Sequence, residues 1–432
     1  MRRLTLLLAG LALVACGDDD EPAAEPEEFA EETPHEPPEE RPLVDDDPLA
    51  GLDEVENLQG DEATAAAALR TDVEVPPRGC AFADEGPVLL WRRPGIAAMT
   101  AVGDGFAIAG YGRKEDGSEE IFLLHLVPGR MADLILRRDL EHSLRTARVA
   151  PPGLAARDGG RVGLAYTDGR AQVHYARLGL GDDRGHFVVV GQGADQRYAP
   201  AVGFRDADDL VAWADGSGAD HARVQLARLL GGTRVSDVRD VTPDASGATA
   251  PIVVGDTLLY ADHRQGISSL YTVQLPDGQP EVLRPVSHLF DPVALAAARW
   301  NDRWLVGYTA VGSAAQTAVG LVVADGDRTP PPAAIVPSSG YGMLHVAATQ
   351  LAESVVFVAD ASTAPERESP RRLDVRVAWS DATRGEPLSI QGPEGTEARF
   401  GTTAAHGGVV GVAFGSPDGV YLRLLRCDPG AG

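Results

Sequence analysis

Four aspartates have a type and spacing that could support chemistry, because each follows a short apolar stretch in an equivalent segment of the chain: Asp168, Asp215, Asp262 and Asp360. Carboxylates act as general acids or bases, as cation ligands, or as acceptors for the backbone amides of a turn. Catalysis and metal binding need different groups converging on one site, whereas these four recur along the sequence. We therefore interpret them as structural residues that fix hairpin turns.

The sequence offers few other signs of catalysis. The histidines are scattered, without a His-Glu-x-x-His pattern, and neither a Gly-x-Ser-x-Gly elbow nor a phosphate-binding loop is found. The acidic turns "DADDLVAWADGSGAD" and "VADGDRTP" do not match an EF-hand loop and read as solvated turns. We predict no catalytic residues, no metal site and no cofactor. Glycosidase carboxylate pairs stay open, because they would converge from distant segments.

The three cysteines suggest two further kinds of chemistry. Arg2 and Arg3 precede an apolar run that is too short to span a bilayer and that ends at Cys16. The residues "LVAC" at 13–16 resemble the lipobox of bacterial lipoproteins. That resemblance implies a signal peptide over residues 1–15, lipid attachment at Cys16 and a place in the bacterial cell envelope, at the outer membrane or cell surface. An ordinary secretory signal that happens to end near a cysteine is the alternative.

Residues 16–79 have the composition of a tether. From residue 17 to residue 79 the chain has 22 acidic residues against 3 arginines, a net charge of -19 out of -26 for the whole chain. The segment is also rich in proline, so it lacks the apolar surface needed to offset the entropy of ordering. We predict a disordered acidic tether that holds the following domain away from the membrane.

Residues 80–432 contain a repeat. Apolar strands that end near an aromatic residue recur with separations of 55, 47, 47, 48, 50 and 56 residues. The equivalent positions are Tyr111, Tyr166, Trp213, Tyr260, Tyr308, Val358 and Phe414. A period near 50 with strand-like alternation is typical of propeller blades. We predict an all-β fold, a seven-bladed β-propeller of four-stranded antiparallel blades, with "FDPVALAAARW" as the first strand of the fifth blade.

Cys80 and Cys427 stand at the two ends of this repeat region. If "PVLLW" forms the outer strand of the last blade, it pairs antiparallel with "VYLRLLRC" and brings the two sulfur atoms together. An even pair of cysteines in an exported protein favours a disulfide. We predict that this bond closes the ring. Two independent buried thiols are the alternative.

The segment "LLYADHRQGISSLYTVQL", with Tyr260, Asp262, Gly266 and Tyr271, resembles a repeat of bacterial surface and secreted propellers. The resemblance is to lipoproteins with sialidase-like or related propeller domains, and it implies the fold. Sialidase activity would need an Arg-Ile-Pro stretch and Asp boxes. The chain lacks the former, and "SPDGVY" at Ser416 misses the Asp-box spacing by one residue.

These observations favour a lipid-anchored, non-enzymatic binding or scaffold module for a protein, peptide or glycan partner. The alternatives are a glycan-active enzyme of the sialidase or lyase type, and an envelope-assembly factor. Residues 80–432 carry 42 acidic and 33 basic residues, a net charge of -9. Such a surface disfavours nucleic acid, whose binding depends on neutralising phosphates. We expect a monomer attached to the membrane through its lipid.

Overall fold

The computed structural model describes residues 68–142, 144, 150–180, 185–216, 222–242, 247–264, 267–287, 290–300, 303–312, 317–324, 333–336, 345–361, 371–379 and 385–430. They lie within one compact unit, Gln59–Gly432. Cys16 and the predicted signal peptide fall outside these residues, as does most of the predicted tether. Within the described ranges the helical structure is one 3-10 turn, η1 (Pro393–Gly395), and no helix has the length and apolar character to cross a bilayer.

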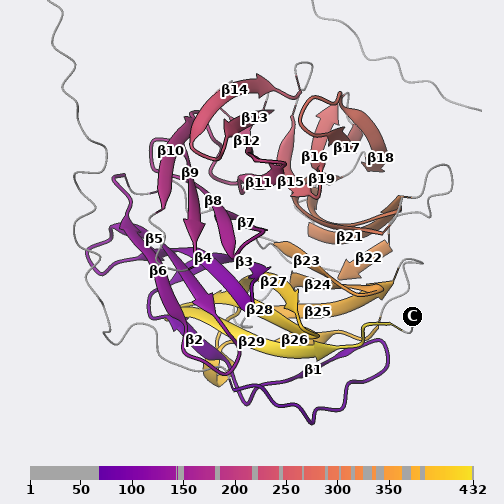
Figure 1. Ribbon diagram of the computed structural model, residues 1–432. Helices are drawn as coiled ribbons and strands as arrows, with labels where there is room; N and C mark the ends of the chain where they lie inside the picture. The colour runs from indigo at the N-terminus through magenta and orange to yellow at the C-terminus, as the bar shows by residue number, and fades with distance from the viewer. Residues whose placement is uncertain are drawn as a thin grey trace, which may run out of the picture. The chain divides into compact units, whose positions relative to one another are not determined.

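The described strands form antiparallel sheets arranged around a central axis, which is a β-propeller (Figure 1). The innermost strands are β3 (Gly95–Val102), β7 (Gly153–Arg157), β11 (Ala201–Arg205), β15 (Thr249–Val254), β19 (Phe290–Trp300), β23 (Val346–Leu351) and β27 (Arg399–His406). The second strands are β4 (Gly105–Arg113), β8 (Arg161–Thr167), β12 (Asp208–Asp215), β16 (Thr257–Arg264), β20 (Arg303–Gly312), β24 (Ser354–Ala361) and β28 (Val409–Ser416).

The remaining strands complete the sheets toward the outside. The third strands are β5 (Glu119–Leu126), β9 (Val173–Gly179), β13 (Arg223–Leu230), β17 (Ile267–Gln274), β21 (Thr317–Ala324), β25 (Arg372–Trp379) and β29 (Gly419–Cys427). The outer strands are β6 (Asp133–Asp139), β10 (His186–Gly191), β14 (Arg234–Asp240), β18 (Glu281–Ser287), β22 (Ala333–Val336) and β26 (Leu388–Ile390). Two short strands, β1 (Cys80–Phe82) and β2 (Val88–Trp91), pair with β29.

Among the described strands, six sheets are four-stranded blades and one sheet has five strands. We name the blades in chain order, from the first (β3–β6) to the sixth (β23–β26), and call the five-stranded sheet (β1, β2, β27–β29) the closing sheet. β1 and β2 pair with successive stretches of the same edge of β29, residues 425–427 and 420–422, so together they fill the outer position of this sheet. The prediction of four-stranded antiparallel blades is therefore confirmed, with the outer strand of the closing sheet divided into two short strands. "FDPVALAAARW" forms β19, as predicted.

Burial falls from the inner to the outer strands. Every residue of β28 is buried, whereas β14 is mostly exposed. The second strands lie between two neighbouring sheets and read as nearly continuous apolar runs, while an outer strand has water on one side. This gradient explains why the second strands carry the clearest repeat signal in the sequence.

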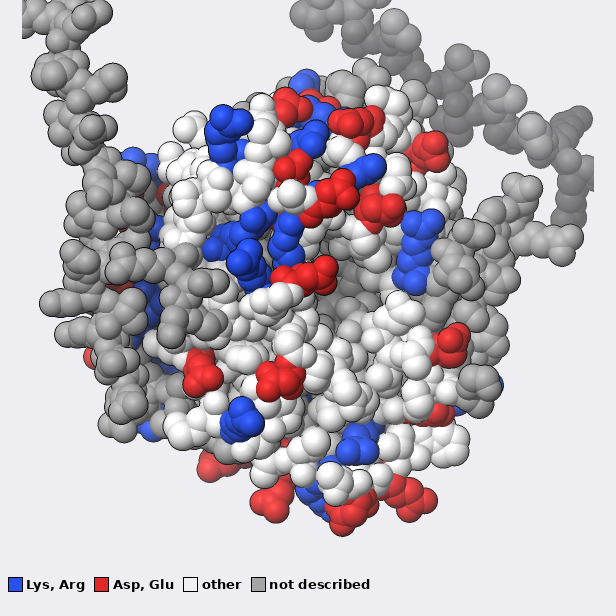
Figure 2. All heavy atoms as spheres, in the orientation of Figure 1, with Lys and Arg blue, Asp and Glu red and all other residues white. Residues whose placement is uncertain are grey.

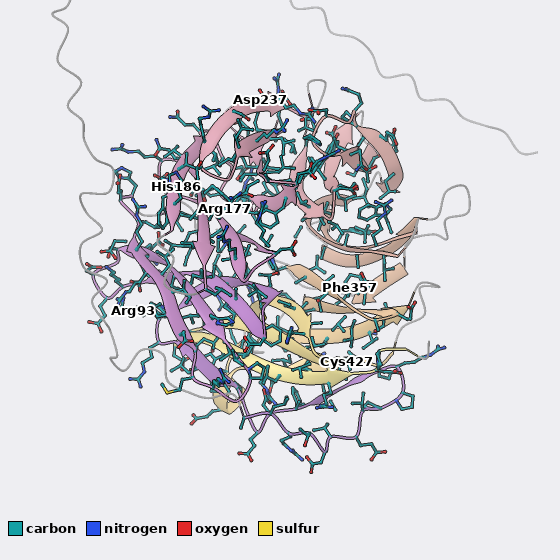
Figure 3. All side chains as sticks on the ribbon, in the orientation of Figure 1. Arg93, Arg177, His186, Asp237, Phe357 and Cys427 are labelled. Atoms are coloured by element: carbon teal, nitrogen blue, oxygen red, sulfur yellow. A yellow bond between two sulfur atoms is a disulfide. The ribbon has the colours of Figure 1, made fainter. Side chains whose placement is uncertain are left out.

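Apolar clusters lie between successive sheets and hold the ring together. Phe357 of β24, labelled in Figure 3, packs in one of them, where a Cβ on Gly307 of the preceding blade would lie 2.8 Å from its ring. Another cluster joins Phe106 of the first blade to Val420 of the closing sheet, so the ring is closed. Leu69, ahead of the predicted domain start at Cys80, packs against that same cluster.

The predicted disulfide is present. Cys80 and Cys427 are directly opposite in the β1–β29 ladder, and the bond joins residues 347 positions apart in sequence. Figure 3 labels Cys427 near the end of the last strand. Both cysteines are buried among the apolar residues between the sixth blade and the closing sheet. The bond therefore links the first and last strands of the ring covalently.

Candidate functional site

The four predicted hairpin aspartates lie at or just beyond the ends of second strands. Asp168 directly follows β8, Asp215 ends β12, and Asp262 and Asp360 lie near the ends of β16 and β24. Each belongs to a different blade, so the fold spreads these carboxylates around the ring. They do not form one catalytic or metal centre. No group of three or more potential ligands that would suit a metal ion is found in the described residues.

Asp168 holds the turn between β8 and β9. Its Oδ1 atom accepts hydrogen bonds from the backbone N–H groups of Arg170 and Gln172, at 2.9 and 3.0 Å. The Nε2 atom of His174 lies 3.3 Å from Oδ2. The Asp168 side chain is buried, and its geometry is that of a carboxylate closing a tight turn.

Asp262 and Asp215 have other partners. The Oδ1 atom of Asp262 accepts a hydrogen bond from the N–H of Gly247, which precedes the first strand of the same blade, at 3.1 Å. Asp215 pairs with Arg223 in the β12–β13 ladder, and its backbone also forms a bridge to Ala194. The repeated position therefore has a different local partner in each blade.

Asp360 differs most from the others. Its Oδ2 atom accepts a hydrogen bond from the N–H of Phe400 in the closing sheet, at 3.3 Å, while Oδ1 has no hydrogen-bond partner among the described residues. Burial raises the pKa of this carboxyl to about 7, although the guanidinium groups of Arg371 and Arg399 act in the opposite direction. A buried carboxyl with a displaced pKa is one mark of a functional region.

A pocket of about 570 Å³ opens beside this position, between the first blade and the closing sheet. Its lining comes from the start of β3, the end of β4, the start of β5, the start of β27 and the end of β28, together with Leu144 and Pro417. In an antiparallel blade these strand ends meet at one edge, which is why residues distant in sequence gather here. The volume falls within the range of small-ligand sites.

The two sheets approach closely at this edge because glycine occupies both contacting strands. A Cβ on Gly415 of β28 would lie 2.3 Å from the carbonyl oxygen of Gly95 in β3. A Cβ on Gly95 would lie 3.1 Å from a methyl carbon of Val420 in the closing sheet. Larger residues would push the sheets apart, so the glycines fix the width of the pocket.

Most polar side chains in the lining already have partners. The Tyr111 hydroxyl accepts a hydrogen bond from the N–H of Thr167, at 2.9 Å, and burial raises the pKa of this tyrosine. Glu119 accepts a hydrogen bond from the N–H of Leu144, at 2.5 Å. The Ser416 hydroxyl lies 3.2 Å from that of Thr396.

Two arginines supply the positive charge of the pocket. Arg113 ends β4 and is exposed, and no described residue accepts a hydrogen bond from its guanidinium. Arg399 begins β27 and donates one hydrogen bond from Nη2 to Glu397, while its buried Nε has no hydrogen-bond partner among the described residues. Burial lowers the pKa of Arg399, and the neighbouring Arg371 guanidinium adds to this effect. Arginine still stays protonated at neutral pH.

Phe400 forms part of the pocket wall in an unusual backbone conformation, with φ at 52°. A bulky residue rarely adopts this left-handed region, and strain of this kind clusters at functional sites. The hydrogen bond to Asp360 holds its N–H, and the ring of His345 packs edge-on against the Phe400 ring with centroids 6.3 Å apart. Burial lowers the pKa of His345 to about 4, so the imidazole is neutral.

A second cluster of charged residues has a structural role. Asp209 of the third blade is fully buried, and its carboxylate accepts hydrogen bonds from Arg157, from Arg177 at 2.6 and 2.7 Å, and from the Tyr175 hydroxyl at 2.5 Å. Those three partners belong to the second blade (Arg177 is labelled in Figure 3). Both oxygens are occupied, so this carboxylate ties two blades together and has no free atom for a substrate.

A fully buried carboxylate of the first blade is held in a similar way. Glu120 accepts hydrogen bonds from Arg93 and Arg137, both at 2.8 Å. Figure 2 shows basic and acidic side chains lying next to one another on the face toward the viewer, more densely over the second, third and fourth blades than below. On this face, much of the abundant arginine is paired with acid.

Sequence analysis did not locate this pocket, although a signal for it existed. The repeat position that carries aspartate in four segments is Arg113, Ala310 and Ser416 in the other three. Arg113 and Ser416 line the pocket, and they come from adjacent sheets. Two of the three departures from the repeat therefore lie at the pocket.

Comparisons with known proteins support the fold. No family model matches the chain, and no curated protein matches it in sequence. Among solved structures it is similar to the BP39L lectin from Burkholderia pseudomallei, with TM-score 0.54 and 15% identity over 79% of this chain and 98% of that one. It is also similar to an ulvan lyase of the PL25 polysaccharide lyase family, with TM-score 0.50 and 10% identity over 79% and 96% of the two chains. At these identities the likeness concerns the fold alone.

Proposed function

We propose that this protein is a binding propeller of the bacterial cell envelope, which holds a partner in the pocket between the first blade and the closing sheet without transforming it. Lipid attachment at Cys16 anchors the chain at the outer membrane or cell surface, and the acidic segment over residues 16–79 sets the propeller at a distance. The propeller acts as a monomer whose ligand is a protein, a peptide or a glycan.

The composition of the pocket lining is the observation that carries this proposal. It contains two arginines and a single carboxylate, Glu119, which already accepts a hydrogen bond from the backbone of Leu144. Glycoside hydrolysis ordinarily uses a pair of carboxyl groups, one as acid and the other as base or nucleophile. A pocket with fixed cations and no such pair is suited to retaining an anionic ligand.

The central channel agrees with a binding role. The innermost strands carry small residues in their central positions, as in "GIAAMTAV" (β3), "GLAAR" (β7) and "VAATQL" (β23). Of the innermost strands in the described sheets, only β19 contains an acidic residue, Asp291. Converging carboxylates along the channel would instead have favoured an enzyme.

One observation favours the glycan-active alternative. Asp360 has a pKa raised to about 7 and lies against Phe400 in the pocket wall, and a general acid or base works best near the ambient pH. Its side chain is only 3% exposed, however, so a substrate would need the wall to move. In the binding proposal this carboxyl positions Phe400.

Capture from envelope fractions with full-length protein tests the binding proposal. Wild type, Arg399→Gln, Cys16→Ser and a control, Arg234→Gln on the exposed outer strand β14, serve as baits. We expect wild type and the control to retain the same partner, Arg399→Gln to lose it, and Cys16→Ser to leave the membrane pellet. The recovered partner should have an unchanged mass.

Two results would count against the proposal. A partner recovered as cleaved or eliminated fragments would make the protein an enzyme. Retention of the same partner by wild type and Arg399→Gln alike would remove the pocket from the binding function. A Cys16→Ser protein that stays in the pellet after a salt wash would refute only the lipid anchor.

A further inference from the structure

We propose that the pocket between the first blade and the closing sheet binds an acidic peptide segment of a partner, with a side-chain carboxylate held between Arg113 and Arg399 and a neighbouring apolar side chain against Phe400. This inference rests on the proposed binding function and names its ligand class.

Among the polar side chains of the pocket lining, the two arginine guanidinium groups are the ones that keep N–H groups without a described acceptor. Tyr111, Glu119 and Ser416 are engaged with described neighbours through Thr167, Leu144 and Thr396 respectively. The exposed Arg113 guanidinium has no acceptor among the described residues, and the Arg399 side chain is 42% exposed with one described acceptor, Glu397. Both guanidinium groups therefore present N–H groups that an incoming oxygen atom can reach.

The charges around Arg399 favour an anionic ligand. Arg371 lies close enough to Arg399 for the two guanidinium groups to repel, and within the described part of the chain Arg399 is hydrogen-bonded to one carboxylate, that of Glu397. A ligand carboxylate relieves that repulsion and forms charge-assisted hydrogen bonds, which are stronger than neutral ones. Neutral ligands would gain neither benefit.

The rest of the lining is apolar side chain or glycine backbone. Ile96, Leu144, Phe400 and two prolines, Pro94 and Pro417, account for most of the remaining side chains. A sugar carries a hydroxyl on nearly every carbon and would need several donors and acceptors to offset their burial. A peptide that places one carboxylate beside an apolar side chain needs only the arginines and the apolar wall.

Two tripeptides with uncharged ends, which differ only in having a side-chain carboxylate or a side-chain amide, test this inference. The probes are N-acetyl-Leu-Glu-Phe-amide and N-acetyl-Leu-Gln-Phe-amide, titrated calorimetrically into full-length protein, with a trimer of galacturonate as the glycan probe. We expect the Glu probe to bind at least about tenfold more tightly than the Gln probe, because a hydrogen bond to a charged group is worth that much. Arg113→Gln and Arg399→Gln should each erase this preference, and Arg234→Gln should keep it.

Each other outcome overturns the inference in a recognisable way. Equal affinity for the Glu and Gln probes, or a preference that survives both arginine substitutions, would show that these arginines do not recognise a carboxylate. Binding of the galacturonate trimer that depends on Arg399, with neither tripeptide bound, would reject a peptide while leaving the proposed binding function intact. Arg113 is exposed, so its variant reports on the site even if Arg399→Gln fails to fold.

Discussion

The second blade and the junction between the first blade and the closing sheet use one repeat position in opposite ways. In the second blade, Asp168 is buried and accepts the backbone amides of its own turn. At the junction, the equivalent residues are Arg113 and Ser416, and both line an open pocket. A position that serves the fold in one blade therefore lines a pocket where the first blade meets the closing sheet.

The closing sheet also differs from the other sheets in how it is held. Elsewhere neighbouring sheets are joined by packing and by ion pairs such as Arg157 with Asp209. At the closing sheet, strands from both ends of the chain pair side by side, and Cys80 is bonded to Cys427. The covalent bond lies in the same sheet as Ser416 and Arg399, which are both pocket residues.

Removing the disulfide of the closing sheet should have the largest effect on stability. Cys80→Ser and Cys427→Ser should each lower the free energy of unfolding by up to about 5 kcal/mol, because the unfolded chain regains the entropy of a very long loop. The double variant should be no less stable than the single ones, as measured by chemical denaturation. Additive losses in the double variant would mean that each cysteine stabilises the fold independently.

The pH dependence of Asp360, whose carboxyl accepts a hydrogen bond from Phe400 in the pocket wall, should separate this position from the other repeat aspartates. Its pKa is raised from 3.8 to about 7 in the folded protein, so between these values the folded state binds a proton that the unfolded state releases. The stability that this group contributes is present below pH 4 and is lost as the pH rises toward 7. The unfolding free energy of Asp360→Asn, relative to that of wild type, should therefore rise by up to about 4 kcal/mol as the pH increases from 4 to 7.

Melting temperatures of both proteins from pH 4 to pH 8 would measure this gain. His345, whose pKa is lowered to about 4, acts in the opposite direction in wild type, because its folded form stays neutral while the unfolded form takes up a proton below about pH 6.5. The difference between variant and wild type removes this background. Asp237→Asn, at an exposed position of β14 labelled in Figure 3, is the control, and an equal gain there would contradict the assignment.

Asp168→Ala tests the structural role of the repeat aspartate in the second blade. The substitution leaves the amides of Arg170 and Gln172 without their acceptor and should cost about 2 kcal/mol of unfolding free energy. Peptide binding at the junction should be unaffected, since the second blade contributes no residue to the pocket lining. A loss of less than about 0.5 kcal/mol in urea denaturation would show that the turn does not depend on this carboxylate.

Arg113→Asp, which restores the repeat residue at the junction, should have the smallest effect on stability. The position is exposed, so the unfolding free energy should change by less than about 0.5 kcal/mol. Affinity for the Glu tripeptide should nevertheless fall, because the substitution replaces attraction by repulsion. Thermal denaturation and calorimetry on one preparation would check both parts, and a large loss of stability would mean that Arg113 also serves the fold.

The pairing of the chain ends was predictable from sequence, and its details were not. Two cysteines at the borders of a repeat region, in a chain expected to be exported, indicated the bond between Cys80 and Cys427. The sequence "PVLLW" was identified as a partner of the C-terminal strand, and it forms β2. The three-residue strand β1 was missed because "CAF" carries no periodicity, so its pairing depends on β29 already being in place.

The candidate site was less accessible to sequence reasoning. Arg113 and Ser416 were visible as exceptions to the aspartate pattern, but they are about 300 residues apart, and only ring closure makes their sheets neighbours. The strained backbone of Phe400 and the buried state of Asp360 depend on contacts between the sixth blade and the closing sheet. Local propensity cannot report such contacts.

The sequence alone determined the propeller class, the repeat length, the acidic segment ahead of the domain and the cysteine pair, because hydrophobic periodicity, charge and cysteine position are local properties of the chain. Only the tertiary structure decided which repeat positions face a pocket, which carboxylates are buried, and how two short strands share the outer edge of β29 in the closing sheet. These features depend on distances between segments far apart in sequence, and such distances are fixed only when the last strand meets the first.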